Sequence, residues 1–277
     1  MRGRSEEGIA LIAVLGTLAL LSFIAALLSF ETRTETRIAR NVVDNAAARA
    51  AADAGIERAV LDLIAAPGTD NDKFRADGTI YNWRLSNITV RISVQDEIGK
   101  INLNQVSEAV MDAVLRSVGV DPGTAQSLAN ATADFRDPDS FSRAPGAEEA
   151  DYRAAGLAWG PKNAPFEALE ELQNVLGMTA EIYERVTPNL TIYSGGAINP
   201  TLAGERLTSI LREAGFKDFV SDRGMAYSIR AEAKSSNGAV FVREAVVQLN
   251  PESTIPVLVL AWLDGVPRGS HDTPTGR

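Results

Sequence analysis

The spacing of hydrophobic and polar residues divides the chain near its N-terminus. Residues 9–30 carry no charged side chain, and as a helix they would rise about 33 Å, enough to cross the hydrocarbon core of a bilayer. Beyond this segment, apolar residues recur at three- and four-residue steps until a break at Pro67-Gly68. These residues are Ile38, Val42, Ala46, Ile56, Val60 and Leu63. The pattern predicts one continuous helix from Ile9 to Ala65, apolar in its first half and amphipathic in its second.

A cleaved secretory signal is the alternative interpretation of the apolar segment. Signal peptides have an apolar region of about 7 to 15 residues, followed by small residues at the cleavage site. Ala25-Ala26 could supply such a site, but the apolar run continues to Phe30. The length of the run therefore favours a retained membrane helix.

Period-two alternation predicts an antiparallel sheet later in the chain. One strand covers residues 88–94, and a hairpin is predicted around Ser236-Asn237-Gly238, because Asn-Gly favours tight hairpin turns. A further apolar strand runs from Val257 to Leu263. Together with the long helix, these strands predict an α+β fold in which the helix packs on the sheet.

Two pairs of amphipathic segments lie between the predicted strands. The first pair covers residues 110–118 and 125–133, and the second covers residues 169–176 and 182–186. Each pair is joined near a glycine, as in a helical hairpin. The chain from 102 to 196 is therefore expected to be an all-α domain inserted into the sheet.

The N-terminus resembles that of type IV pilin-like proteins. A short polar leader ends at Gly8, and the apolar helix starts at once in EEGIALIAVLG. The resemblance implies that a membrane peptidase cuts between Gly8 and Ile9 at the cytoplasmic face, with methylation of the new N-terminus. Ala13 takes the place of the glutamate that most members carry at mature residue five. Because that glutamate is thought to neutralise the amine of a neighbouring subunit, its absence implies a subunit with no neighbour above it.

The rest of the chain resembles the K-type minor pseudopilins of bacterial type II secretion systems. The phrases that carry this resemblance are DEIGKINLN at 96–104, ADFRD at 133–137, NAPFEALEELQNVLGM at 163–178 and GGAINP at 195–200. In that family a pilin-like helix-on-sheet domain carries an inserted helical, SAM-like domain. The resemblance implies a single-pass protein of the inner membrane, periplasmic at its C-terminus. It would sit at the tip of the pseudopilus with other minor pseudopilins and the major pseudopilin.

This resemblance implies that the chain is divided into five parts. They are a leader (1–8), a transmembrane half-helix (9–30), a pilin-like domain (31–101 and 197–264), the insert (102–196) and a flexible tail (265–277). The alternatives are a minor pilin of a type IV pilus or DNA-uptake system, and a plain single-pass anchor carrying a periplasmic binding domain.

Composition and charge argue against other classes of function. The net charge of −9 disfavours nucleic acid as a partner, and the predicted hairpin at 166–190 carries five glutamates against Arg185 alone. The chain has no cysteine, and its one histidine, His271, lies in the polar tail. With no phosphate-binding loop or metal-histidine motif, the sequence predicts neither an enzyme nor a small-molecule substrate.

An acidic segment, DFRDPDSFSRAPGAEEADY, is the one candidate for metal chemistry. Its carboxylates are Asp134, Asp137, Asp139, Glu148, Glu149 and Asp151. Oxygen ligands in a loop suit calcium, and the K-type resemblance also implies bound calcium near such a loop. The alternative is a solvated turn in which these residues cap helices.

Overall fold

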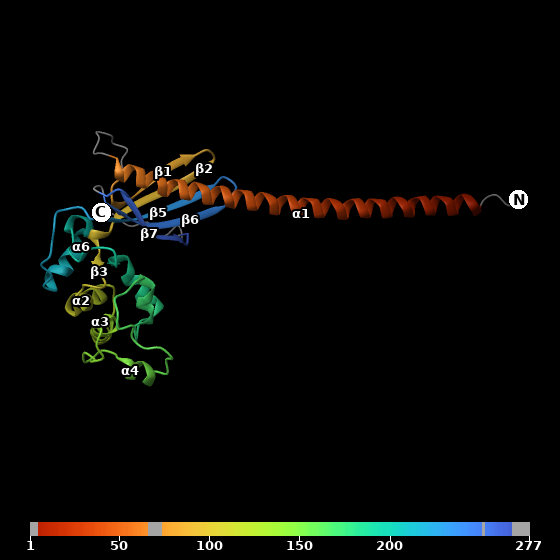
Figure 1. Ribbon diagram of the computed structural model, residues 1–277. Helices are drawn as coiled ribbons and strands as arrows, with labels where there is room; N and C mark the ends of the chain where they lie inside the picture. The colour runs from red at the N-terminus through yellow and green to blue at the C-terminus, as the bar shows by residue number, and fades with distance from the viewer. Residues whose placement is uncertain (1–4, 66–73, 251–252, 268–277) are drawn as a thin grey trace.

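The computed structural model describes residues 5–65, 74–250 and 253–267. The first helix, α1 (Ser5–Ile64), is a single element of 60 residues. Its C-terminal part lies on the globular body, and its N-terminal part extends far beyond it (Figure 1). The predicted continuous helix is thus observed, whereas the break at Pro67-Gly68, residues 1–4 of the leader and residues 268–277 of the tail lie outside the described residues.

Among the side chains described, none of the helices is both long and apolar enough to cross a membrane. The predicted membrane segment, residues 9–30, includes residues 9–12 and 26–30, whose side chains lie outside the described part.

The sheet has five antiparallel strands in the order β1-β2-β5-β6-β7. They are β1 (Asp77–Leu85), β2 (Ile88–Asp96), β5 (Ala226–Ser235), β6 (Val240–Leu249) and β7 (Val257–Asp264). The predicted strands are present, and β5 and β6 form the hairpin around the Asn-Gly turn. At the tip of this hairpin, the Asn237 amide donates to the Asp44 carboxylate of α1 at 3.0 Å. Strand β1 was not predicted.

The C-terminal part of α1 packs closely on the middle of the sheet. Its buried positions start at Ala48 and continue through Ile56 to Ala59, and they meet buried residues of β2 and β5. Gly55 lies at the closest approach, because a Cβ there would stand 2.9 Å from Val90 Cγ1 and 3.0 Å from Ala231 Cβ. Among the side chains described N-terminal to Ala48, the apolar ones are exposed, so the helix leaves the sheet near that point.

The predicted helical insert is present between β2 and β5. Its elements are η1 (Glu97–Gly99), β3 (Ile101–Asn102), α2 (Glu108–Ser117), α3 (Pro122–Arg136), α4 (Glu149–Ala154), η2 (Leu169–Asn174), α5 (Ala180–Val186), η3 (Thr187–Asn189), β4 (Leu190–Thr191) and α6 (Pro200–Glu213). Strands β3 and β4 form a short parallel pair. The segment 169–176, expected to be an α-helix, is the 3-10 helix η2. The observed α+β architecture, a long helix on an antiparallel sheet with an inserted helical domain, is the predicted one.

The insert has a hydrophobic core of its own. Val114, Leu115, Leu128 and Tyr152 are buried together from α2, α3 and α4. Leu211 of α6 belongs to the same core, so the helical unit continues past residue 196. The insert therefore has an apolar interior of its own, and it lies beside the sheet (Figure 1).

Candidate metal site

The acidic segment follows helix α3, whose two ends are set by local sequence signals. Asp121 caps the start, where its side chain accepts the Thr124 N–H at 3.1 Å, and Pro122 occupies the first turn. The helix ends at Arg136, since Asp137 is extended and Pro138 follows it. This ending places Asp134 in the last turn and Asp137 at the mouth of the loop.

Asp134 is fully buried and organises the loop that returns to α4. Its carboxylate accepts the backbone N–H of Arg143 at 3.2 Å and that of Ala147 at 2.9 Å. It also pairs with the Arg143 guanidinium, with 2.8 Å between Oδ1 and Nη1. Gly146 permits this close turn, because a Cβ there would stand 2.1 Å from Asp134 Oδ2. Asp134 is therefore occupied by the protein and does not face open space.

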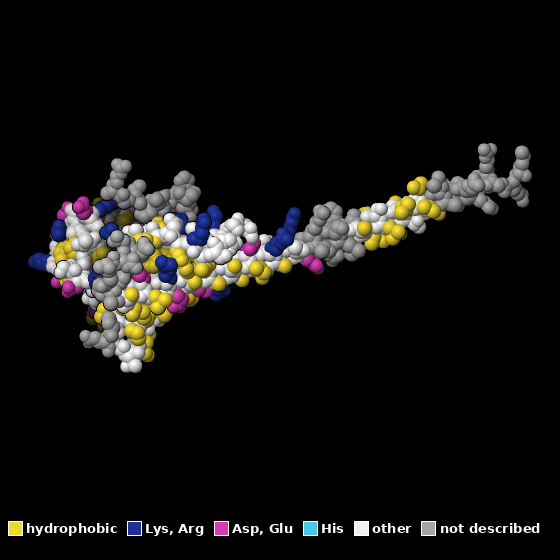
Figure 2. All heavy atoms as spheres, turned by 90° about the horizontal axis from the view of Figure 1, so that it is seen from above, with side chains coloured by type: hydrophobic (Ala, Val, Ile, Leu, Met, Phe, Trp, Pro, Cys, Tyr) yellow, Lys and Arg dark blue, Asp and Glu magenta, His cyan; other side chains and the backbone are white. Residues whose placement is uncertain are grey.

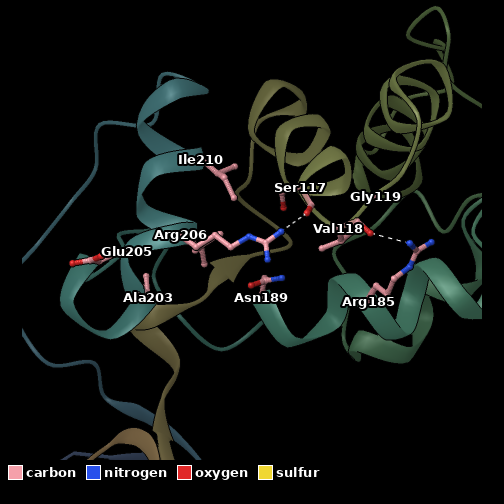
Figure 3. A pocket seen from close by; sticks show the side chains of 11 residues that line it. Ser117, Val118, Gly119, Arg185, Asn189, Ala203, Glu205, Arg206 and Ile210 are labelled. Atoms are coloured by element: carbon pink, nitrogen blue, oxygen red, sulfur yellow. Dashed lines mark hydrogen bonds between the residues drawn. The ribbon is translucent and has the colours of Figure 1, made fainter. Parts of the chain in front are cut away.

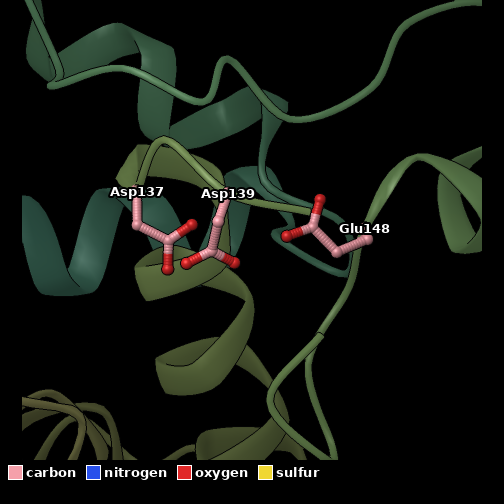
Figure 4. Close-up of side chains that lie close together, drawn as sticks. All are labelled: Asp137, Asp139 and Glu148. Atoms are coloured by element: carbon pink, nitrogen blue, oxygen red, sulfur yellow. The ribbon is translucent and has the colours of Figure 1, made fainter. Parts of the chain in front are cut away.

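Three of the predicted carboxylates converge at one point. One oxygen each from Asp137, Asp139 and Glu148 lies within 4.8 Å of the others. Asp137 and Asp139 come from the end of α3 and the loop after it, and Glu148 comes from the residue before α4 (Figure 4). The path of the loop thus joins carboxylates that are separated along the sequence.

Glu148 is the N-cap residue of α4 and faces Asp151 as in a capping box, but its side chain makes no capping hydrogen bond. Glu148 is only 6% exposed, and both of its carboxylate oxygens are buried without a hydrogen-bond partner, as is Oδ1 of Asp137. Desolvation raises the pKa of Glu148, and the nearby charges of Asp134, Asp137 and Asp139 raise it further. Buried polar groups in native proteins are normally hydrogen-bonded. The three buried oxygens without a partner are therefore available to coordinate a cation or to bind water.

The other two predicted carboxylates do not join the cluster. Glu149 is exposed and pairs with Arg153 at 2.5 Å, one helical turn away on α4. Asp151 accepts the backbone N–H of Glu148 at 2.9 Å and so stabilises the start of α4. Asp151 thus acts as a cap, as the alternative interpretation expected.

Sequence reasoning did not identify the partners that hold the loop in place. Arg143 contacts Asp134, Asp137 and Glu108 of α2, with 3.0 Å between Arg143 Nε and Glu108 Oε1. Arg143 was visible inside the acidic segment as one of its few cations. Glu108, far away in sequence, gave no signal.

The residues present fit a divalent cation of the calcium type. Calcium takes six to eight oxygen ligands, commonly carboxylates, in flexible geometry. Asp137, Asp139 and Glu148 would supply side-chain oxygens, two of them from residues whose orphaned atoms are already desolvated. A bound divalent cation would offset two of the three negative charges and fix the loop between α3 and α4.

A separate cleft of about 1110 Å³ lies beside the C-terminal end of α2 (Figure 3). Two arginines approach the last carbonyls of that helix: Arg206 Nη2 donates to Ser117 O at 2.7 Å, and Arg185 Nη1 donates to Val118 O at 2.9 Å. Positive groups at a helix C-terminus satisfy its free carbonyls and its dipole. The arginines therefore have a structural role at this end of α2.

The predicted processing site lies within the first turns of α1. Gly8 and Ile9 are helical, but their side chains lie outside the described part. Cleavage between them stays a prediction.

The fold is pilin-like: one long N-terminal helix lies on an antiparallel sheet, and a helical domain is inserted between two neighbouring strands. A solved structure has the same fold. One chain of the GspK-GspI-GspJ complex of the type 2 secretion system from enterotoxigenic Escherichia coli matches with a TM-score of 0.57 and 15% identity. The match covers 86% of the present chain and all of the other.

Residues 92–195 match the family model described as type II secretion system protein K. The type II secretion system protein K of Pectobacterium carotovorum subsp. carotovorum is 25% identical over 210 residues, and a relative from Escherichia coli K12 named for the same protein is 23% identical over 207. These matches cover 68% of the present chain and 62–63% of each relative's length. The predicted resemblance to the K-type minor pseudopilin family is confirmed.

Proposed function

We propose that the chain is a minor pseudopilin of a bacterial type II secretion system that helps to initiate the pseudopilus and so supports protein export across the outer membrane. The observation that carries the proposal is the pairing of a protruding helix α1 with a protein K-type insert. The named relatives are secretion-system proteins, which favours this role over a pilus or DNA-uptake role. The role is structural and not catalytic, with no nucleic acid or small molecule as substrate.

The first half of α1 would hold the chain in the inner membrane, with the globular part in the periplasm. From Ala13 to Ala25 every described side chain is exposed, including Leu15, Leu21 and Phe23. An apolar helix without protein cover is stable in lipid or against other apolar helices. Cleavage at Gly8-Ile9 would precede assembly, and the intact mass of the mature chain from native membranes tests it. A chain that still carries residues 1–8 contradicts the proposal.

The next part of α1 would contact neighbouring subunits. Ile38, Val42 and Val43 are 58–66% exposed where the helix has left the sheet, and Figure 2 shows hydrophobic side chains along this part of the helix. In the complex named above, GspK is assembled with GspI and GspJ. We propose that the equivalent partners of this chain are other minor pseudopilins, with the major pseudopilin below them.

A matched pair of variants tests this contact. Val42→Gln removes an apolar group from the exposed stripe formed by Ile38, Val42 and Val43. Arg40→Gln introduces a glutamine two residues away, about 200° around the helix. We expect Val42→Gln to reduce co-purification of the other minor pseudopilins and Arg40→Gln to leave it unchanged. Equal behaviour of the two variants would argue against the stripe as the interface. Loss of enzyme export in a deletion strain, with piliation intact, separates secretion from the pilus alternatives.

We further propose that the cluster of Asp137, Asp139 and Glu148 binds calcium. The buried, unpartnered oxygens support this. Calorimetric titration of the full chain with calcium chloride should release or absorb heat, and calcium should raise the thermal midpoint. Glu148→Gln should abolish both effects, whereas Glu149→Gln, on the neighbouring exposed residue, should retain them. An unaffected Glu148→Gln variant would exclude this cluster as the site.

A further inference from the structure

Arg143, on the loop between α3 and α4, connects helices α2 and α3 through one guanidinium. Its Nη1 contacts Asp134 of α3 and Asp137 at the end of that helix, and its Nε lies 3.0 Å from Glu108 Oε1 at the start of α2. Arg136, the nearest other arginine in sequence, is directed elsewhere and donates to the carbonyls of Leu103 and Val106. Arg143 is therefore the cation that the described residues provide to this part of the acidic segment.

The guanidinium covers only one side of the cluster. Asp137 uses Oδ2 for Arg143, while its Oδ1 is buried without a hydrogen-bond partner. The Asp137 carboxylate also belongs to the group formed with Asp139 and Glu148. No ion pair to Asp139 or Glu148 is found among the described residues. Asp137 thus stands between a fixed positive group and the open set of oxygens.

We propose that Arg143 is a built-in competitor for the divalent cation: it neutralises the acidic loop from one side and thereby weakens binding on the other. This inference rests on the proposed calcium site. Two cations that share the Asp137 carboxylate repel each other. Water at Arg143, whose side chain is 40% exposed, and at the exposed Asp139 screens this repulsion in part, whereas Asp134 and Glu148 are buried. The guanidinium also withdraws Asp134 from metal binding, so the cluster takes one cation through Asp137, Asp139 and Glu148.

The main chain allows the charge of Arg143 to be removed while the loop is kept. Asp134 holds the loop through the backbone N–H groups of residues 143 and 147, at 3.2 and 2.9 Å. These bonds do not depend on the side chain at 143. Arg143→Gln should therefore retain the loop path, although the metal-free protein loses stability because the buried Asp134 carboxylate loses its ion pair.

The test uses the full chain in detergent with calcium chloride as the probe. Affinity is measured by calorimetry, and the thermal midpoint is measured in chelator and in calcium. We expect Arg143→Gln to bind calcium about tenfold more tightly than wild type, by removal of one repelling charge, and to show a larger calcium-induced rise in midpoint. Arg143→Lys, which keeps the charge, should bind like wild type. Arg153→Gln removes the same charge from the exposed pair on α4 and should change nothing.

The possible outcomes separate this inference from the calcium proposal. If wild type binds and Arg143→Gln binds equally or more weakly, competition is refuted while the calcium site stands. If only Arg143→Gln binds, competition is supported and the calcium site of the wild-type chain is refuted. If neither protein binds calcium, both the calcium site and the competition by Arg143 are refuted. Circular dichroism of the metal-free variant confirms that it is folded.

Discussion

Gly55 gives a quantitative test of how α1 packs on the sheet. In an exposed helix, replacing glycine by alanine stabilises by about 1 kcal/mol, because glycine loses more backbone entropy on folding. At Gly55 the added methyl would lie 2.9 Å from Val90 Cγ1 and 3.0 Å from Ala231 Cβ. Both neighbours are fully buried in central strands, so the helix itself must shift.

The magnitude follows from the two opposing effects. Overpacking of a core costs about 1–3 kcal/mol, against the gain of about 1 kcal/mol in helix propensity. We therefore expect Gly55→Ala to lower the free energy of unfolding by about 1 kcal/mol. Gly55→Val should lower it further, because two more methyl groups must enter the same space.

Hydrogen exchange of the full chain in detergent measures this effect locally. Peptides from residues 48–64 and from β2 report the free energy of opening where helix and sheet meet. Ala47→Gly, at an exposed position of the same helix, reports the propensity effect alone and should cost about 1 kcal/mol. If Gly55→Ala stabilises by as much as Ala47→Gly destabilises, the helix does not press on the sheet and the packing argument is wrong.

Two further predictions concern groups that fasten the pilin-like part. Arg243 is 3% exposed and pairs with Asp53 of α1 at 2.6 Å and with Asp264 of β7. Arg243→Met should lower the free energy of unfolding by about 1 kcal/mol in urea titration, because the ion pairs are lost but water reaches Asp53 and Asp264, which are 35% and 60% exposed; an unchanged free energy of unfolding would refute this. Asp96 is buried and accepts the Gly224 N–H at 2.9 Å, and burial raises its pKa above the usual 3.8. A raised pKa means that the native state binds the proton more tightly than the unfolded state does. The difference in free energy of unfolding between wild type and Asp96→Ala should therefore be largest below pH 3.8, decrease as the pH rises through the raised pKa, and then level off. A difference that grows with pH would contradict the raised pKa of Asp96.

The elements with strong periodicity could be predicted from sequence, and the others could not. Helix α1, strand β2 and the β5-β6 hairpin bury one face and so display their period. Strand β1 lies at the edge of the sheet, where its positions are only partly buried and its sequence does not alternate. In η2, Leu169 and Leu172 are three residues apart, a spacing that suits a 3-10 helix as well as an α-helix.

For the candidate site, the residue types were visible in the sequence but their arrangement was not. Carboxylate chemistry in one segment indicated calcium. Which carboxylates converge depends on the path of the loop, which is set by Asp134 through its bonds to the main chain. Glu148 and Glu149 are neighbours at the start of α4, but only Glu148 joins the cluster, whereas Glu149 pairs with Arg153. Sequence pattern alone does not contain that information.

The position of the helical insert between β2 and β5 has a consequence for how this fold can diversify. Asp96 and Tyr227 are direct partners across β2 and β5, so the chain departs and returns at the same rung of the ladder. The pairing of β2 with β5 therefore requires only that the two ends of the intervening segment lie close together. Domain insertions are tolerated best at such positions. The helical insert can therefore be enlarged, shortened or exchanged while helix α1 and the five-stranded sheet keep their geometry.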